Sequence, residues 1–189
     1  MKIMFRPYLR MLSSPLITAF RTVSKKSFPA YRSLEEDEIE RIKKSWVLVK
    51  ENDFRFIDIL RQEMLCDIMM YELYFNPGRK ADVCVSELTE FKNHPKNVYS
   101  TLDFIVGDLE NENVIIEKMI EIGKNHGRLG ISRKHISFMT STIYQAVECT
   151  IGPCMFDRLV DQSWEKFLTS FNDVVGVTAM KNNCRDRIC

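Results

Sequence analysis

The sequence has few of the residues that build metal and nucleotide sites. Only three of its 189 residues are histidines, and it has seven glycines and six prolines. It contains no GxxxxGK[ST], GxGxxG, HExxH or GxSxG motif, which argues against P-loop and dinucleotide-binding proteins, HExxH metalloproteases and GxSxG hydrolases. No apolar run approaches the roughly 20 residues that cross a bilayer. We therefore expect a soluble protein that is not an enzyme.

Six cysteines are present, but none forms a CxxC pair, and no signal peptide with a long apolar centre precedes them. We therefore expect the thiols to be free and the protein to lie in a reducing compartment, the cytoplasm. Cys66, Cys149 and Cys154 lie in segments with helical spacing of apolar residues, where we expect small buried side chains.

Acidic residues are absent from the first 34 positions, which hold seven Lys and Arg residues. Since the whole chain has a net charge of +1, the rest carries −6. This asymmetry predicts a basic extension over 1–33, a domain over 34–181 and a flexible tail over 182–189. Three interpretations of the extension stay open: a mitochondrial transit peptide, a segment lying on an anionic membrane, and a solvated tail. The acidic body argues against nucleic acid as a partner.

From Ser33 onward the apolar residues recur with helical spacing, and no two-residue alternation is sustained. Ser33 and Glu36 have capping-box spacing for a first helix. Asn76-Pro77-Gly78 marks a turn, Ser132 is placed to cap a later helix, and Gly152-Pro153 is placed to end it. The pattern predicts an all-α domain of six or seven helices with no parallel sheet.

Histidine is the remaining candidate for metal chemistry. His94 and His126 are 32 residues apart on two expected helices, while His135 falls in the first turn of another, where we expect it to be exposed. Two histidines do not complete a tetrahedral zinc site. A haem iron needs only one or two protein ligands, and a pocket rich in Phe, Met, Ile and Val would bury the ring. From spacing alone, two ordinary histidines, one in a core and one on the surface, remain the alternative.

Six segments, in order and at matching spacing, resemble landmarks of the globin family. They are EIERIKKSW (Glu38–Trp46), YELYFN (Tyr71–Asn76), FKNHPKNV (Phe91–Val98), IGKNHGRLGIS (Ile122–Ser132), VECTIGP (Val147–Pro153) and SWEKFLTSFNDVV (Ser163–Val175). The resemblance covers about Leu34 to Lys181 and is closest to the neuroglobin-like type, with an invertebrate or nematode character. It implies a globin fold of six to eight helices that enclose a haem pocket.

The resemblance also implies roles on the proximal side of haem b. His126 is implied as the iron ligand, with its second ring nitrogen donating to a carbonyl of its own helix. Phe75 is implied to stack on the porphyrin, or Tyr74 if the register slips by one residue. Apolar side chains are implied around the ring: Val98 over the iron on the distal side, and Ile122, Ile131 and Ile136 on the proximal side and the ring edge.

The distal side departs from the family pattern. His94 is implied either to contact bound oxygen or to bind iron as a sixth ligand, but Pro95 follows it and removes a helical hydrogen bond. If the helix restarts there, Pro95 becomes its first residue and His94 its cap. Family spacing places Arg61 beside the ligand. A slip of one residue places Leu60 there, which fits the apolar stripe better.

Reversible binding of dioxygen or another diatomic gas is the function that the resemblance implies. The alternative is a redox or gas-sensing globin, served by a reductase and held near a membrane or in mitochondria by residues 1–33. Minor redox chemistry on nitrite or superoxide stays open. A haem-free helical interaction module is the third hypothesis, and the presence of both His94 and His126 argues against it.

Overall fold

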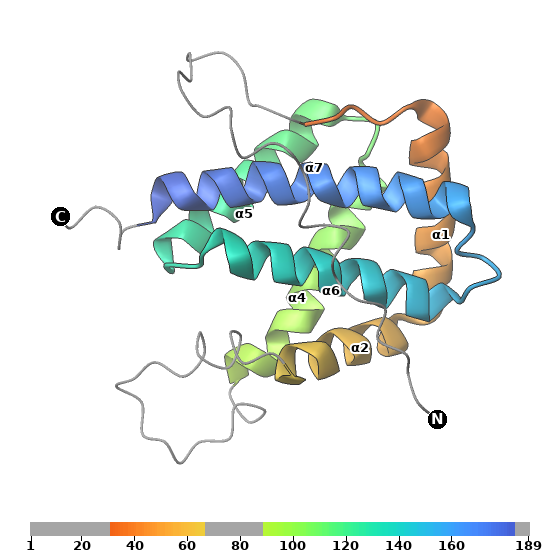
Figure 1. Cartoon of the computed structure of the whole chain (residues 1–189), viewed down its shortest axis with the longest axis horizontal. Helices are drawn as coiled ribbons and strands as arrows, with labels where there is room; N and C mark the ends of the chain where they lie inside the picture. The colour runs from red at the N-terminus through yellow and green to blue at the C-terminus, as the bar shows by residue number, and fades with distance from the viewer. Residues whose placement is uncertain (1–30, 67–88, 184–189) are drawn as a thin grey trace.

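The computed structural model describes residues 31–66 and 89–183, which form α-helices joined by short connections (Figure 1). The helices are α1 (Glu36–Glu51), α2 (Asp53–Cys66), α4 (Thr89–Gly107), α5 (Glu112–Arg128), α6 (Arg133–Ile151) and α7 (Arg158–Asn182). The described ranges contain no β-strand. The all-α prediction is confirmed.

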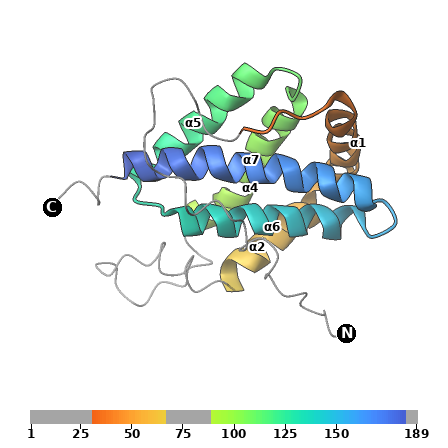
Figure 2. The ribbon, with the colours of Figure 1, turned by 45° about the horizontal axis from the view of Figure 1, so that its top comes forward.

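The helices pack around one apolar core. Helix α7 lies against α5, α6 and α1, while α2 packs on α6 and α4. The two views of the ribbon show α6 and α7 running side by side (Figures 1 and 2). Every described helix contributes fully buried side chains to the core, among them Ile42, Phe56, Leu102, Ile115, Ala146 and Trp164. Apolar residues recur every three or four positions along each helix, so each helix has one apolar face that can be buried.

The first helix begins later than the capping-box prediction. Its N-cap is Glu35, whose backbone N–H donates to Glu38 Oε2 over 2.8 Å. Ser33 instead donates its hydroxyl to Glu112 of α5 over 3.0 Å. The Ser33–Glu36 prediction was wrong because a second pair with the same spacing, Glu35 and Glu38, lies two residues further on. The Glu35 side chain accepts from the backbone N–H of Glu38, as the hydroxyl of a capping box would.

The segment before α1 contacts the helical body. Tyr31 and Leu34 pack against the core, and the backbone N–H of Arg32 donates to Ser170 Oγ of α7 over 3.1 Å. The contacts therefore begin before position 34, where we placed the start of the domain. The basic residues before Tyr31 lie outside the described ranges. Among the helices that the structure describes, none is long and apolar enough to cross a membrane.

Two cysteine predictions were wrong. Cys149 and Cys154 are exposed free thiols, not buried groups. Cys149 follows the buried pair Ala146 and Val147 on α6, but it has turned onto the outer face of the helix. Cys154 lies beyond the end of α6, in the connection to α7. The side chain of Cys66 lies outside what the structure describes.

Helix α4 is continuous from Thr89 to Gly107, with Pro95 buried inside it. The helix does not restart at Pro95, so His94 is a helical residue and not a cap. Because proline has no N–H, the carbonyl of residue 91 has no partner at position 95. The packing of α4 against its neighbours must offset this loss.

Replacement of Pro95 by alanine is expected to stabilise the protein. Proline inside a helix is about 3 kcal/mol less favourable than alanine, and loss of the buried ring offsets about 1 kcal/mol of that gain. We expect the free energy of unfolding to rise by about 2 kcal/mol in urea titrations followed by circular dichroism. Lys96→Ala, at the exposed next position, is the control and should change little. A less stable Pro95→Ala variant would show that ring packing outweighs the restored hydrogen bond.

Glycine lets α5 approach α7 closely. A Cβ built at Gly123 would lie 2.6 Å from Thr178 Cβ and 2.8 Å from the carbonyl oxygen of Val175, both on α7. Neither backbone leaves space for a methyl group. Gly127, one turn later, is also buried against α7.

Gly123→Ala should therefore destabilise the fold. Forcing α5 and α7 apart is expected to lower the free energy of unfolding by about 2 kcal/mol, measured by thermal or urea unfolding. Gly107→Ala is the matched control, because its added Cβ meets nothing within 4 Å. That variant should be neutral or more stable by up to about 1 kcal/mol. Equal stability of the two variants would contradict close packing at Gly123.

Candidate functional site

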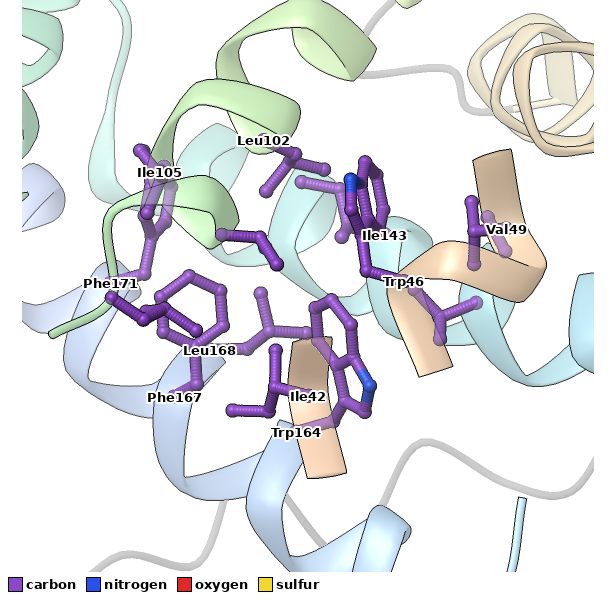
Figure 3. Close-up of a cluster of buried hydrophobic side chains, with 14 of the residues drawn as sticks. Ile42, Trp46, Val49, Leu102, Ile105, Ile143, Trp164, Phe167, Leu168 and Phe171 are labelled. Carbon is purple, nitrogen blue, oxygen red and sulfur yellow. The ribbon is translucent and has the colours of Figure 1, made fainter. Parts of the chain in front are cut away.

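A cavity of about 230 Å³ lies between α4, α5, α6 and α7, and we call it the pocket. The α4 side chains that line it are His94, Asn97, Val98, Thr101 and Leu102. The rest come from α5 to α7: Ile122, His126, Ile131, His135, Ile136, Met139, Thr140, Ile143, Phe171 and Val175. Leu102, Ile143 and Phe171 also belong to the core cluster (Figure 3), so pocket and core share a wall.

His126 is half-buried near the end of α5, and one of its ring nitrogens is fixed by its own helix. Nδ1 lies 2.8 Å from the carbonyl oxygen of Ile122, one turn earlier. A carbonyl oxygen only accepts, so Nδ1 carries the proton and donates. The predicted bond from His126 to its own helix is confirmed. Nε2 is then the ring nitrogen that can bind a metal.

His94 enters the pocket from α4. Burial of its ring, followed by the nearby His126, lowers the pKa of the His94 imidazole from 6.5 to about 4. Burial disfavours the charged form because the pocket cannot replace the lost hydration. At neutral pH His94 is therefore uncharged, and the pocket brings two imidazoles together from separate helices.

His135 also lines the pocket, which the sequence analysis missed. It was expected to be exposed, but it is half-buried in the first turn of α6. Its Nδ1 accepts from the backbone N–H of Ser132 over 3.1 Å and lies 2.7 Å from Ser132 Oγ. This confirms Ser132 as the cap and makes His135 its partner in a capping box. The Ser-x-x-His spacing was the available signal. All three histidines of the chain line one pocket.

The apolar residues named from the resemblance come together at the pocket. Val98, Ile122, Ile131 and Ile136 all line it. Met139, Ile143, Phe171 and Val175 were not predicted. Each of them lies three or four residues from another lining residue of its own helix, a spacing that would have indicated them. Phe75 and its alternative Tyr74 lie outside the described residues.

Leu60 and Arg61, the two candidates for the distal side, differ in burial on α2. Leu60 is fully buried in the core, while Arg61 is half-exposed and pairs with Asp58 over 3.1 Å. Leu60 faces inward as expected. Neither residue belongs to the set that lines the pocket.

His94 and His126 suit a metal whose other ligands come from a bound ring. Within the described ranges, no three His, Cys, Asp or Glu side chains are grouped to hold a metal ion. A tetrahedral zinc site therefore lacks ligands there. Two imidazoles beside apolar walls match axial ligation of a planar macrocycle.

Comparisons with known proteins agree with this geometry. A family model described as Globin matches residues 64–175, which include all three pocket histidines. A similar solved structure is the crystal structure of a hexacoordinated haem protein from an anhydrobiotic tardigrade at pH 4. It is 14% identical, has a TM-score of 0.64, and the match covers 78% of this chain and 96% of that one. At this identity the likeness shows the fold alone. A search of curated proteins found no match.

The family model extends from the end of α2 into α7 and spans more than half of the 189 residues. The helices that it covers are those that form the pocket, and the segments from Phe91 to Val175 that resembled the family lie within it. This chain belongs to the globin family.

Proposed function

We propose that this globin holds haem b in the pocket, with iron bound to His126 Nε2, and that it reversibly binds dioxygen or another diatomic gas on the His94 side. One observation carries the proposal. An uncharged His94 on α4 and His126 on α5 meet at one pocket with a largely apolar lining. The hydrogen bond from His126 Nδ1 to the Ile122 carbonyl oxygen leaves Nε2 as the His126 nitrogen that can bind a metal.

The side chains present fit the cofactor. Haem supplies four nitrogen ligands and the iron that binds the gas, so the protein needs to add only axial ligands and an apolar enclosure. Valine, isoleucine, methionine and phenylalanine side chains provide that enclosure. Their burial against the ring would contribute most of the binding free energy through the hydrophobic effect.

His126 is held for this role by Ile122. The hydrogen bond from Nδ1 to the Ile122 carbonyl fixes the tautomer, limits rotation of the ring and makes Nε2 a stronger donor to a metal. Gly123 and Gly127 lie before and after His126 on α5, and both lie close against α7. This close packing fixes how far His126 reaches into the pocket. Val98 and Ile136 would exclude water from the two faces of the ring.

We propose that His94 is the sixth iron ligand when no gas is bound, as in the neuroglobin-like branch. Its low pKa keeps it neutral and able to coordinate at physiological pH. The similar tardigrade structure is described as hexacoordinated. A gas molecule would then displace His94, which would remain close enough to donate a hydrogen bond.

Absorption spectra of the haem-loaded protein test both ligands. Ferrous wild-type protein should show sharp, split visible bands, and His94→Leu should replace them with a broad five-coordinate spectrum that sharpens with oxygen. His126→Leu should lose most of its haem on gel filtration. His135→Leu is the matched control, since it also removes a pocket histidine but should keep the split bands. Split bands in His94→Leu would contradict ligation by His94, and no Soret band in wild type would overturn the haem proposal.

The charge of the first 34 residues favours a second function, sensing or electron transfer near an anionic membrane with a reductase as partner. Seven basic residues and no acidic ones would gain about 1 kcal/mol each near such a surface. Co-sedimentation should therefore show binding to vesicles that contain phosphatidylserine, and salt should weaken it. Vesicles of phosphatidylcholine alone are the control. Equal binding to both vesicle types would contradict electrostatic attachment.

A further inference from the structure

The turn between α5 and α6, together with the helix ends that flank it, has two different sides. Its inner side lines the pocket through His126, Ile131 and His135. Arg128 and Leu129, in the same stretch of chain, are exposed to solvent. One short segment therefore belongs both to the pocket and to the outer surface of the molecule.

The end of α7 lies beside this turn. A Cβ built at Gly127 would lie 2.9 Å from Asn182 Cβ. Arg133, at the start of α6, donates to Asp173 Oδ1 of α7 over 2.8 Å. Met180 is seven residues after Asp173 and so lies on the same face of α7, the face that α6 approaches. Both ribbon views show the start of α6 beside the C-terminal end of α7 (Figures 1 and 2).

The exposed side chains at these three helix ends are mostly basic or apolar. Residues 122–135 and 174–183 include five Lys or Arg residues and no Asp or Glu, whereas the chain after position 34 is net negative. Leu129 is 70% exposed and Met180 is 54% exposed. We call this surface the basic end, and it consists of Lys124, Arg128, Leu129, Lys134, Met180 and Lys181.

The fold does not require a large apolar side chain at Leu129. The positive φ of Gly130 and a hydrogen bond from the Ile131 N–H to the His126 carbonyl over 3.0 Å end α5, and Ile131 packs against the core. Leu129 contributes its backbone N–H, which donates to the same carbonyl over 3.1 Å. A single exposed leucine is ordinary. Two exposed apolar side chains at one basic end of the molecule indicate a binding surface.

We propose that the basic end binds an anionic lipid bilayer, with Leu129 and Met180 inserted between lipids and with Arg128 and Lys134 against their phosphate groups. The inference rests on the second proposed function for its membrane, and it names the part of the helical body that faces the bilayer. Haem is not needed for this contact.

Charge and apolar side chains act together at such a surface. Lys and Arg residues are attracted to an anionic leaflet within a Debye length, about 10 Å at an ionic strength of about 0.1 M. Leucine and methionine gain free energy by leaving water. An extended anionic surface can engage both the basic end and the basic residues of 1–34, which favours a bilayer over a compact acidic protein. Because His126 lies on the inner side of the same turn, a bilayer bound here would lie against the wall of the pocket.

Charge reversal in the full-length chain tests the surface. A starting variant replaces the seven Lys and Arg residues of positions 1–34 with glutamine, so that the body alone supplies the attraction. At low salt it should still co-sediment with vesicles rich in phosphatidylserine, and adding Arg128→Glu with Lys134→Glu should weaken binding about tenfold or more. Lys44→Glu with Lys92→Glu is the matched control. It changes the net charge equally at exposed positions of α1 and α4, and it should alter binding less than about twofold.

A tryptophan placed in the basic end tests insertion. Both native tryptophans are buried, so brominated phospholipids should quench the added indole of Leu129→Trp and spare the others. Its emission should also shift to the blue on binding. Phe54→Trp is the matched control, because Phe54 is 77% exposed but lies on α2, and its emission should not change. Circular dichroism checks that each variant is folded.

Equal binding by the two charge-reversed pairs, or equal quenching in the two tryptophan variants, would overturn the proposal. Failure of the starting variant to bind vesicles would also overturn it and would leave the basic end to an acidic protein partner. If wild-type protein still bound in that case, the second proposed function would stand on residues 1–34 alone. Failure of the wild type to bind would remove both the inference and that function.

Discussion

The close contact of α5 with α7 is the constraint on which the site depends. Gly123 and Gly127 bracket the turn of α5 that carries His126, and both are pressed against α7, from which Phe171 and Val175 form the facing wall. Without a Cβ at these positions, the two backbones meet, and the histidine is held at one depth and one angle. The bond from His126 to Ile122 then orients the ring itself. Helix packing thus positions the backbone at His126, and the local hydrogen bond orients its ring.

Helical periodicity made most of the fold predictable. The end of α5, the cap at Ser132 and the end of α6 at Gly152 follow from residues with strong local preferences, and Gly130 and Gly152 adopt the positive φ that favours glycine. Exposure was harder to predict. Cys149 and the buried residues before it have similar polarity, so only the three-dimensional direction of α6 decides which of them faces water.

The site was predictable where local spacing and resemblance agreed. His94, His126, Val98 and the isoleucines named from the resemblance meet in the pocket. His135 was missed because a polar residue in the first turn of a helix is usually solvated, whereas here the N-terminus of α6 itself borders the cavity. The position of Pro95 inside α4 also required the tertiary structure, since local rules favour a restart of the helix there.

The hydrogen bond from Arg32 to Ser170 joins the basic end of the chain to α7 immediately beside Phe171, a residue of the pocket wall. A contact made at Arg32 would therefore bear on the helix that encloses the cavity. A displacement of Arg32 would reach the pocket wall at Phe171 within a single turn of α7.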